Sequence, residues 1–390
     1  MTAREFADPR ARRACLAIGI GATVLAALAG TAAPAQFFAA WLFAWLCVLG
    51  IALGAMANVM IHELTGGEWG FVVRAPLEAA LATLPAVALL GVPLVFGLAH
   101  LYPWAAHAGD PAFAGKRLYL NTPFFVVRAA LDFAVWIALA TALRRQWSRH
   151  RTNAAATPQP AVRVLSIAGL VLYAVTMTLA AVDWIMALSA DWYATGFGLL
   201  VLTSQAFGAF AFAVAVGAAS GAMRGARAVA DDRNAAMVER PNPARDAQDL
   251  GNILLTYAML WAYLAFMQFL VIWAEDLPAE IGWYVARATP PWKALAVVVF
   301  ALQFVVPFVA MLFRGFKRDP ARLGALCGVV LVAHVLEIAW EVLPASPATP
   351  PWLAVLALLA VGALWLHAFM VAHSRAAPAP RRADFGVEHG

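Results

Sequence analysis

A set of ionisable side chains lies inside otherwise apolar stretches of this sequence: Arg128, Asp132, Asp183, His334, Glu337 and Glu341. A charged side chain near the centre of a bilayer costs about 2.5 to 3.5 kcal/mol on insertion scales, so a chain that keeps several of them is expected to pair or hydrate them inside a helix bundle. Carboxylates and histidine can also take up and release protons at such depths. We therefore interpret these residues as the polar interior of a membrane protein and as candidates for a proton path.

The spacing of these residues places them on common helix faces. Arg128 and Asp132 stand at positions i and i+4, where a charge pair can form. A salt bridge that locks this helix to a neighbour and a role in proton transfer both stay open. His334, Glu337 and Glu341 stand at i, i+3 and i+7 along one stripe. A metal could use such a stripe, but no second metal-ligand motif accompanies it, so a hydrated proton path is favoured.

Further polar residues extend this set towards both membrane faces. Gln205, Gln268 and Gln303 add hydrogen-bonding capacity, although any one alone is typical of a packing contact between helices. His62, Glu63 and Glu78 cluster at the cytoplasmic ends of two apolar stretches, where a solvated rim is the simpler interpretation. Together, the inner and outer groups suggest two half-paths that meet at an apolar middle. We expect the outer acids to converge on one water-accessible pocket.

Composition defines the class of protein that must position these side chains. Hydrophobic residues make up 63% of the chain and charged residues 13%, against about 25% charged residues in an ordinary soluble domain. Long continuous apolar runs favour helices over a barrel, because barrel strands are short and alternate in polarity. At roughly 20 residues per crossing, the sequence predicts an all-α polytopic membrane protein of ten spans. They cover about 14–33, 37–60, 75–99, 122–143, 162–188, 196–220, 249–273, 291–313, 322–342 and 351–373.

Basic residues then predict the orientation, since Lys and Arg accumulate on cytoplasmic loops. They cluster before the first span, after the last, and in every second loop between. The opposite loops hold only Lys116, Arg117, Arg287 and Lys293. Both termini should therefore face the cytoplasm of a bacterium, with the chain passing many times through the inner membrane. The net charge of +5 reports this topology and does not indicate nucleic-acid binding.

The chain shows no internal division into separate domains. We expect residues 1–390 to form a single membrane domain, with cytoplasmic linkers at 144–161 and 221–248 and a cytoplasmic tail at 374–390. The first span resembles a signal peptide in its basic start, but its apolar run is longer than a signal peptide has, so we expect it to be retained.

The sequence offers no ligand set for a redox cofactor. The three cysteines are isolated, which excludes a Cys-x-x-Cys or haem-attachment motif. The histidines do not form a pair at matching depth for a b-type haem. No phosphate-binding loop occurs either. We therefore expect the chain to bind no cofactor or metal of its own.

Aromatic residues gather near the predicted outer ends of the spans, where they fit a membrane-interface belt. This set comprises Trp184, Trp192, Tyr193, Trp273, Trp283, Tyr284 and Trp292.

Two stretches of the sequence resemble a known family. The segment from Asp183 to Gly196 reads DWIMALSADWYATG, and the segment from Asp249 to Tyr284 holds DLGN, WAY, QFL, IW, LP and WY in that order. Both are similar to the ActF membrane subunit of alternative complex III, the bacterial quinol:cytochrome c oxidoreductase. That family is related to the integral subunits of polysulfide-reductase (NrfD) type.

The resemblance implies a fold of two four-helix bundles with flanking helices. It also implies a function as an integral subunit of a respiratory quinol oxidoreductase, in which electrons leave quinol elsewhere and protons are handled here. The implied partners are a homologous quinol-binding membrane subunit, an iron–sulfur subunit and c-type haem subunits, together with lipid. Quinol or quinone is the ligand that the resemblance leaves open, since the apolar spans do not define a pocket for it.

Two other functions stay open from the residues alone. A proton-coupled secondary transporter would also carry charges near the midplane, but it predicts inverted repeats with broken helices at corresponding positions, and no such pairing is apparent. A structural membrane anchor would use the charges only as dry ties between helices.

Overall fold

The computed structural model describes residues 8–67, 69–107, 109–152, 159–189, 191–220 and 243–375. In these residues the chain forms helices and no strands. Most of the expected linker 221–248 and nearly all of the expected tail 374–390 lie outside the described residues. The other expected linker, 144–161, is shorter than predicted at both ends, because the flanking helices continue to residue 152 and resume at residue 159.

The long helices and the short ones between them follow the chain in a simple up-and-down order. They are α2 (Pro9–Ala32), α3 (Pro34–Thr65), α4 (Trp69–Leu81), α5 (Leu84–Phe96), α6 (Leu98–Leu101), α7 (Pro103–Ala106), α8 (Thr122–Thr152), α9 (Gln159–Trp184), α10 (Phe197–Ala219), α12 (Pro243–Glu275), α13 (Pro278–Ala286), α14 (Pro290–Phe300), α15 (Val306–Leu312), α16 (Arg314–Lys317), α17 (Pro320–Val342) and α18 (Pro351–Arg375). Proline stands in the first turn of many of them, where its missing N–H leaves no bond unmade.

The prediction of about ten membrane spans is confirmed. Nine helical segments of the described chain are long and apolar enough to cross a membrane, and the bent pair α4 and α5 makes a tenth span. The third span is broken, with a bend of 41° between α4 and α5. Pro85 disfavours helical geometry just before it, and Thr83 in the break accepts a hydrogen bond from Trp365 Nε1 of α18 at 2.9 Å.

The eighth span is also irregular, in a way that the sequence pattern did not predict. Between α14 and α15 the chain makes a π-helical turn, η3, over Ala301–Val305. Such turns insert an extra residue into a helix and are frequent at functional sites. The turn carries Gln303, which is fully buried.

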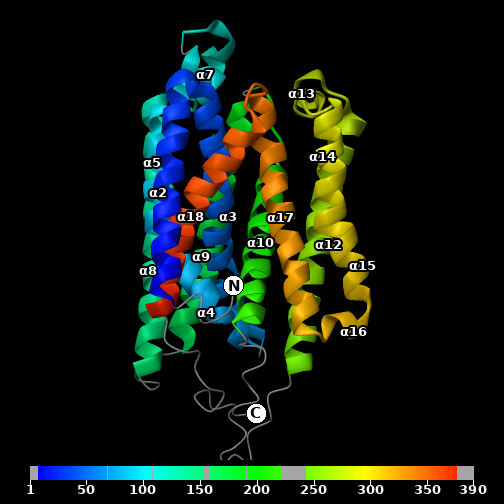
Figure 1. The fold of residues 1–390 in the computed structure, drawn as a ribbon. Coiled ribbons are helices and arrows are strands. Elements are labelled where there is room, and N and C mark those ends of the chain that lie inside the picture. Colours follow the sequence, from blue (N-terminus) through cyan, green and yellow to red (C-terminus); the bar gives the residue numbers. More distant parts are fainter. Residues whose placement is uncertain are drawn as a thin grey trace, which may run out of the picture.

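Two four-helix bundles lie side by side, with two helices flanking them (Figure 1). The first bundle holds α3, α4 with α5, α8 and α9, and the second holds α10, α12, α14 with α15, and α17. Helices α2 and α18 pack against each other, and α18 also packs against α3. The arrangement agrees with the fold that the family resemblance implies.

Helices α3 and α10 form the contact between the bundles. Every residue from 39 to 60 of α3 is buried, as expected for a helix surrounded by others. At Gly54 the two backbones approach so closely that an added Cβ would meet the carbonyl of Gln205. Asn58 donates to the carbonyls of Gly54 and Ala206, both at 2.8 Å, and accepts from the hydroxyl of Tyr257 on α12 at 2.7 Å. Amide and hydroxyl groups thus tie three helices together.

The aromatic residues at the outer ends are divided between the surface and the interior. Tyr193 and Trp273 are exposed, as a membrane-interface belt requires, but Trp184, Trp192 and Trp283 are buried. Trp192 and Trp283 stack with ring centroids 4.1 Å apart, between the loop that precedes α10 and the helix α13. The prediction that these three belong to a belt was therefore wrong, because they fill space between helices.

Candidate functional sites: one acid group in each bundle

The first-bundle acid group consists of Arg128 and Asp132 on α8 and Asp183 on α9. Arg128 Nε lies 2.8 Å from Asp183 Oδ2, and Nη2 lies 2.7 Å from Oδ1, so the pair is bidentate. The third nitrogen, Nη1, donates to the carbonyl of Tyr119 at 2.9 Å. The guanidinium also lies 3.8 Å from the centroid of the Tyr119 ring, which favours the cation.

The predicted charge pair between Arg128 and Asp132 does not form. Arg128 instead pairs with Asp183 on the neighbouring helix α9. This is the interhelical salt bridge that the sequence analysis gave as one of two alternatives. Asp132 is buried, with 6% of its surface exposed. Among the described residues, its Oδ2 has no hydrogen-bond partner. Asp132 is therefore close to both charges of the bridge but outside its hydrogen bonds.

The second bundle holds a carboxylate surrounded by donors. Glu337 of α17 accepts from Trp261 Nε1 at 2.5 Å, from Gln303 Nε2 at 3.3 Å, and from the hydroxyl of Ser204. These donors come from α12, the π-turn and α10, so all four elements of the second bundle meet at this carboxylate. Three donors on one carboxylate favour its ionised form.

His334 lies one turn away on α17, in a slot between the two central helices. A Cβ added at Gly50 of α3 would come within 3.1 Å of His334 Nε2, and one added at Gly208 of α10 within 3.1 Å of Nδ1. At both positions glycine gives the ring more room than a residue with a Cβ would. The hydroxyl of Ser204 is 3.4 Å from Nδ1, while Nε2 has no partner within hydrogen-bonding geometry among the described residues.

Glu341 and Arg287 complete the second-bundle acid group, which we define as Glu337, Glu341 and Arg287. Glu341 is buried, and its carboxylate receives no hydrogen bond from the described residues, although its backbone carbonyl accepts from Arg287 Nη2 at 2.5 Å. Arg287 also donates hydrogen bonds to the backbone carbonyls of Trp283 and Trp340, at 2.8 and 2.9 Å. Burial lowers the pKa of Arg287 to about 9, so the side chain stays a cation at neutral pH.

The inner group consists of His62, Glu63, Arg74 and Glu78, at the predicted cytoplasmic end of the first bundle. Arg74 bonds Glu63 at 2.6 Å and Glu78 at 2.8 Å. Chain reversal at Gly66 and Gly67, both with positive φ, brings α4 back against the end of α3. Arg74 is half-buried and pairs with both glutamates. The inner group is therefore an organised cluster, and not the solvated rim that was the simpler interpretation of the sequence.

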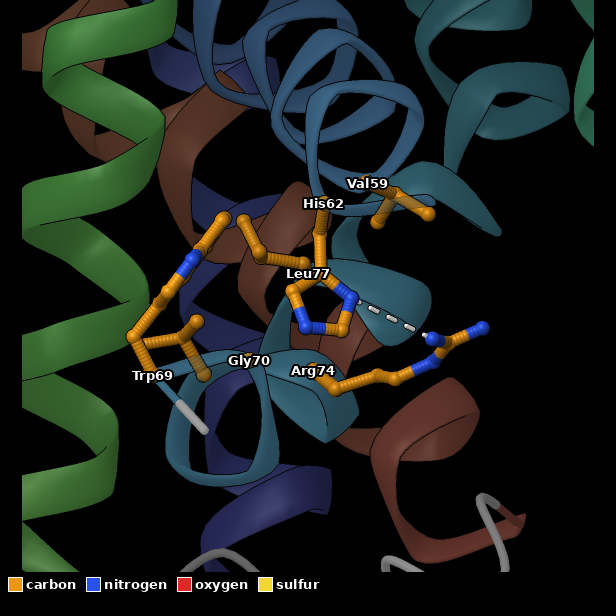
Figure 2. A pocket seen from close by; sticks show the side chains of 7 residues that line it. Val59, His62, Trp69, Gly70, Arg74 and Leu77 are labelled. Atoms are coloured by element: carbon orange, nitrogen blue, oxygen red, sulfur yellow. Dashed lines mark hydrogen bonds between the residues drawn. The ribbon is translucent and has the colours of Figure 1, made fainter. Parts of the chain in front are cut away.

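A small cavity opens beside this inner group (Figure 2). His62 projects into it, with Nδ1 3.4 Å from Arg74 Nη1 and Nε2 3.0 Å from the carbonyl of Gly67. Trp69 meets the imidazole edge-on, and Gly70 leaves the space that the ring needs. The imidazole therefore has a protein partner at each nitrogen.

Of the three predicted glutamines, Gln303 bonds Glu337, whereas Gln205 and Gln268 lie apart from the acids' hydrogen bonds. Gln205 of α10 accepts from the hydroxyl of Tyr173 on α9 at 2.8 Å, so it links the two bundles. Gln268 of α12 has a buried Nε2 with no partner among the described residues. Gln205 therefore makes a contact between helices, which is the interpretation that the sequence analysis gave as typical of a single buried glutamine.

The outer acids do not converge on one shared pocket, and that expectation was wrong. Asp132 and Asp183 belong to the first bundle, whereas every side chain that bonds Glu337 belongs to the second. Trp45, Trp136 and Trp184 pack together in the first bundle.

Sequence reasoning missed three residues of the second-bundle site: Ser204, Trp261 and Arg287. Ser204 and Trp261 are ordinary residues of apolar helices, and only their position beside Glu337 gives them a role. Arg287 was assigned to the loop between the seventh and eighth spans, where its backbone follows α13, but its side chain reaches the backbone carbonyls of Trp340 and Glu341 on α17. Trp261 stood within the second stretch that resembles the ActF family, and that was the one available signal.

Within the described residues, no three His, Cys, Asp or Glu side chains gather as a metal-ligand set. Comparison with protein-family models gives no match for this sequence, and comparison with curated proteins gives none either. The fold and its sites define an all-α, multi-pass membrane protein with a buried acid group in each of two helix bundles.

Proposed function

We propose that this chain is the integral membrane subunit of a respiratory quinol:cytochrome c oxidoreductase of the alternative complex III type, where it provides a proton path. The observation that carries this proposal is the pair of buried acid groups, one in each bundle. Buried ionisable groups in membrane proteins are expensive and are typical of proton and ion pathways. The resemblance of residues 183–196 and 249–284 to the ActF family supports the choice of complex.

In this proposal, the chain's own residues hold and move protons. His62 and the carboxylates of the inner group exchange protons with the cytoplasm, and the acids Asp132, Asp183, Glu337 and Glu341 form the path in the opposite half of the membrane. His334 lies between the central helices, where an imidazole can accept a proton at one nitrogen and release one from the other. Arg128 and Arg287 supply the positive charge that keeps acids ionised in an apolar interior.

The proposed partners follow from the same resemblance. They are a homologous quinol-binding membrane subunit, an iron–sulfur subunit and c-type haem subunits, set in the bacterial inner membrane with both termini of this chain in the cytoplasm. Electrons pass through the partners, and this chain contributes no redox cofactor. Quinol interaction at this chain belongs to the proposal as well.

Purification of the tagged chain from its native membranes in mild detergent tests the proposal. Iron–sulfur and multihaem c-type proteins should copurify and should oxidise quinol. The Asp132→Asn and His334→Ala variants should assemble with the same partners and lose proton-coupled turnover. Recovery of the chain alone, or unchanged proton-coupled turnover in both variants, would overturn it.

A structural anchor is the second candidate, and the bridge between Arg128 and Asp183 favours it. A dry bidentate pair that joins two helices is what an anchor would use. The partnerless Asp132 and Glu341 are harder to explain by that function, since neither ties helices together. The transporter alternative gains no support, because the broken span is the second of the first bundle and the π-turn lies in the third of the second bundle.

A further inference from the structure

The first-bundle and second-bundle acid groups contain the same combination of buried charges: two carboxyl groups and one arginine. The first bundle has Asp132 and Asp183 with Arg128. The second has Glu337 and Glu341 with Arg287. If all carboxyl groups were ionised, each group would keep one uncompensated negative charge in an apolar interior. Such a charge is so unfavourable that the group takes up a proton instead.

Hydrogen bonding distinguishes the two acids within each group. Asp183 receives two N–H donors of Arg128, and Glu337 receives donors from Ser204, Trp261 and Gln303. Asp132 Oδ2 is buried and receives none from the described residues, and the hydrogen bond from Arg287 goes to the backbone carbonyl of Glu341 and not to its carboxylate. Donors stabilise the ionised form, so the acid without donors is the one that keeps a proton.

The charged and titratable groups around the partnerless acids agree with this division. Asp132 faces Arg128 and Asp183, and these two charges already cancel each other in a bidentate pair. Glu341 faces Glu337, Arg287, the Cys47 thiol and the Tyr284 phenol. Arg287 gives its hydrogen bonds to three backbone carbonyls and none to the Glu341 carboxyl group.

We infer that Asp132 and Glu341 each hold one proton in the resting protein, and that Asp183 and Glu337 are fixed, ionised counter-charges that do not carry protons. The proton-carrying acid of each bundle is thus the acid without a hydrogen-bond donor. This assignment deepens the proposed function. That the two protons move during turnover rests on the proposed function, whereas the residues that hold them at rest follow from the hydrogen bonds alone.

A carbodiimide can locate these protons residue by residue in the purified chain. Dicyclohexylcarbodiimide adds to a protonated carboxyl group: the carboxyl oxygen bonds to the carbodiimide carbon and the proton moves to nitrogen. The acyl group then migrates to nitrogen and leaves a stable N-acylurea, which tandem mass spectrometry maps. At neutral pH, adducts should form at Asp132 and Glu341 and not at Asp183 or Glu337. Adducts at Asp183 or Glu337 would overturn the assignment.

Infrared spectroscopy gives a readout that does not depend on reagent access. The folded protein should show carbonyl bands of protonated carboxyl groups at neutral pH. Asp132→Asn should remove an aspartic acid band and Glu341→Gln a glutamic acid band, distinguished by isotope-labelled aspartate. Asp191→Asn, at a side chain that is 86% exposed, should leave both bands. Loss of both bands as expected supports the assignment with or without adducts. Absence of the bands in the wild-type protein, or their persistence in both variants, overturns it.

Neither measurement involves quinol or partner subunits. A chain that fails to copurify with redox proteins can still show the two protons, and a chain that copurifies can still lack them. Failure of this assignment is thereby distinguishable from failure of the proposed function.

Discussion

At the scale of single residues, the buried arginines decide what the acids can do. Arg128 donates two hydrogen bonds to the Asp183 carboxylate and is its ion-pair partner. Breaking a buried pair from one side leaves an uncompensated charge, whereas an exposed pair contributes little. The same type of interaction should therefore have very different effects at two places in this chain.

Arg128→Gln should destabilise the protein by about 3 to 5 kcal/mol, because Asp183 would stay buried without its cation. Thermal unfolding in detergent, followed by tryptophan fluorescence, measures the effect. Asp191→Asn breaks the exposed pair with Lys116, whose side chains are 86% and 43% exposed, and should change stability by at most about 1 kcal/mol. Equal losses of stability in both variants would show that the buried bridge stabilises the protein no more than the exposed pair does.

Trp261 should stabilise the Glu337 carboxylate through the hydrogen bond from its indole N–H. Trp261→Phe keeps most of the ring but removes the donor to Glu337, and a hydrogen bond to a charged group contributes about 1.5 to 3 kcal/mol. Unfolding of this variant should be compared with that of Trp273→Phe, since Trp273 is exposed on the same helix. If both variants unfold like the wild type, Trp261 does not stabilise the carboxylate.

The sequence predicted which residues are buried acids but did not predict which residues they pair with. All the acids of the two outer groups were predicted, because a charge inside an apolar run is conspicuous. Their partners were not: Arg128 reaches Asp183 across 55 positions of sequence, and Arg287 folds back from a loop. Pairing between helices depends on rotation and depth, which hydropathy does not encode.

At the scale of helices, the close contact between α3 and α10 holds the bundles together. Two small residues on α3, Gly50 and Gly54, make room for His334 and for the backbone at Gln205. Small residues allow this kind of approach between helices in a membrane. The contact should therefore be sensitive to a single methyl group.

Gly54→Ala should push α3 and α10 apart and destabilise the protein by about 1 to 3 kcal/mol, as overpacking does in other cores. Gly21→Ala is the matched control, because nothing lies within 4 Å of a Cβ added there. The control should be neutral or slightly stabilising, since alanine favours a helix more than glycine does. A neutral Gly54→Ala in the same unfolding assay would contradict the close packing.

The sequence predicted where helices lie better than how they deviate from regularity. Runs of apolar residues located all ten spans. The break before Pro85 and the π-turn at Gln303 were missed, because the hydropathy of both spans is continuous. Proline is compatible with a helical start, so its presence alone does not distinguish a broken span from a straight one.

At the scale of the whole molecule, the proposed proton path depends on the topology and on the two-bundle arrangement. The start of α2 and the end of α18 lie on the same side, since His367 is 2.9 Å from the carbonyl of Arg12. The helix order along the chain was predictable from hydropathy. The grouping into bundles came from the family resemblance, because no local pattern specifies which helices pack together.

Cysteine labelling in intact cells should report this topology. Leu118→Cys places a thiol in an exposed loop on the predicted outer face, and a membrane-impermeant maleimide should label it without lysis. Arg375→Cys should be labelled only after lysis. The native Cys47 and Cys327 are buried and give little background, and a Cys15→Ala background removes the third. The opposite pattern would invert the orientation and exchange the two half-paths.

In the proposed function, buried acids of this chain carry protons during quinol oxidation. The most direct test of this proposal is the number of protons moved per quinol oxidised by the purified complex in sealed liposomes. Asp132→Asn and Glu341→Gln should each lower that ratio relative to the wild type, while Asp191→Asn leaves it unchanged. An undiminished ratio in both acid variants would contradict the account.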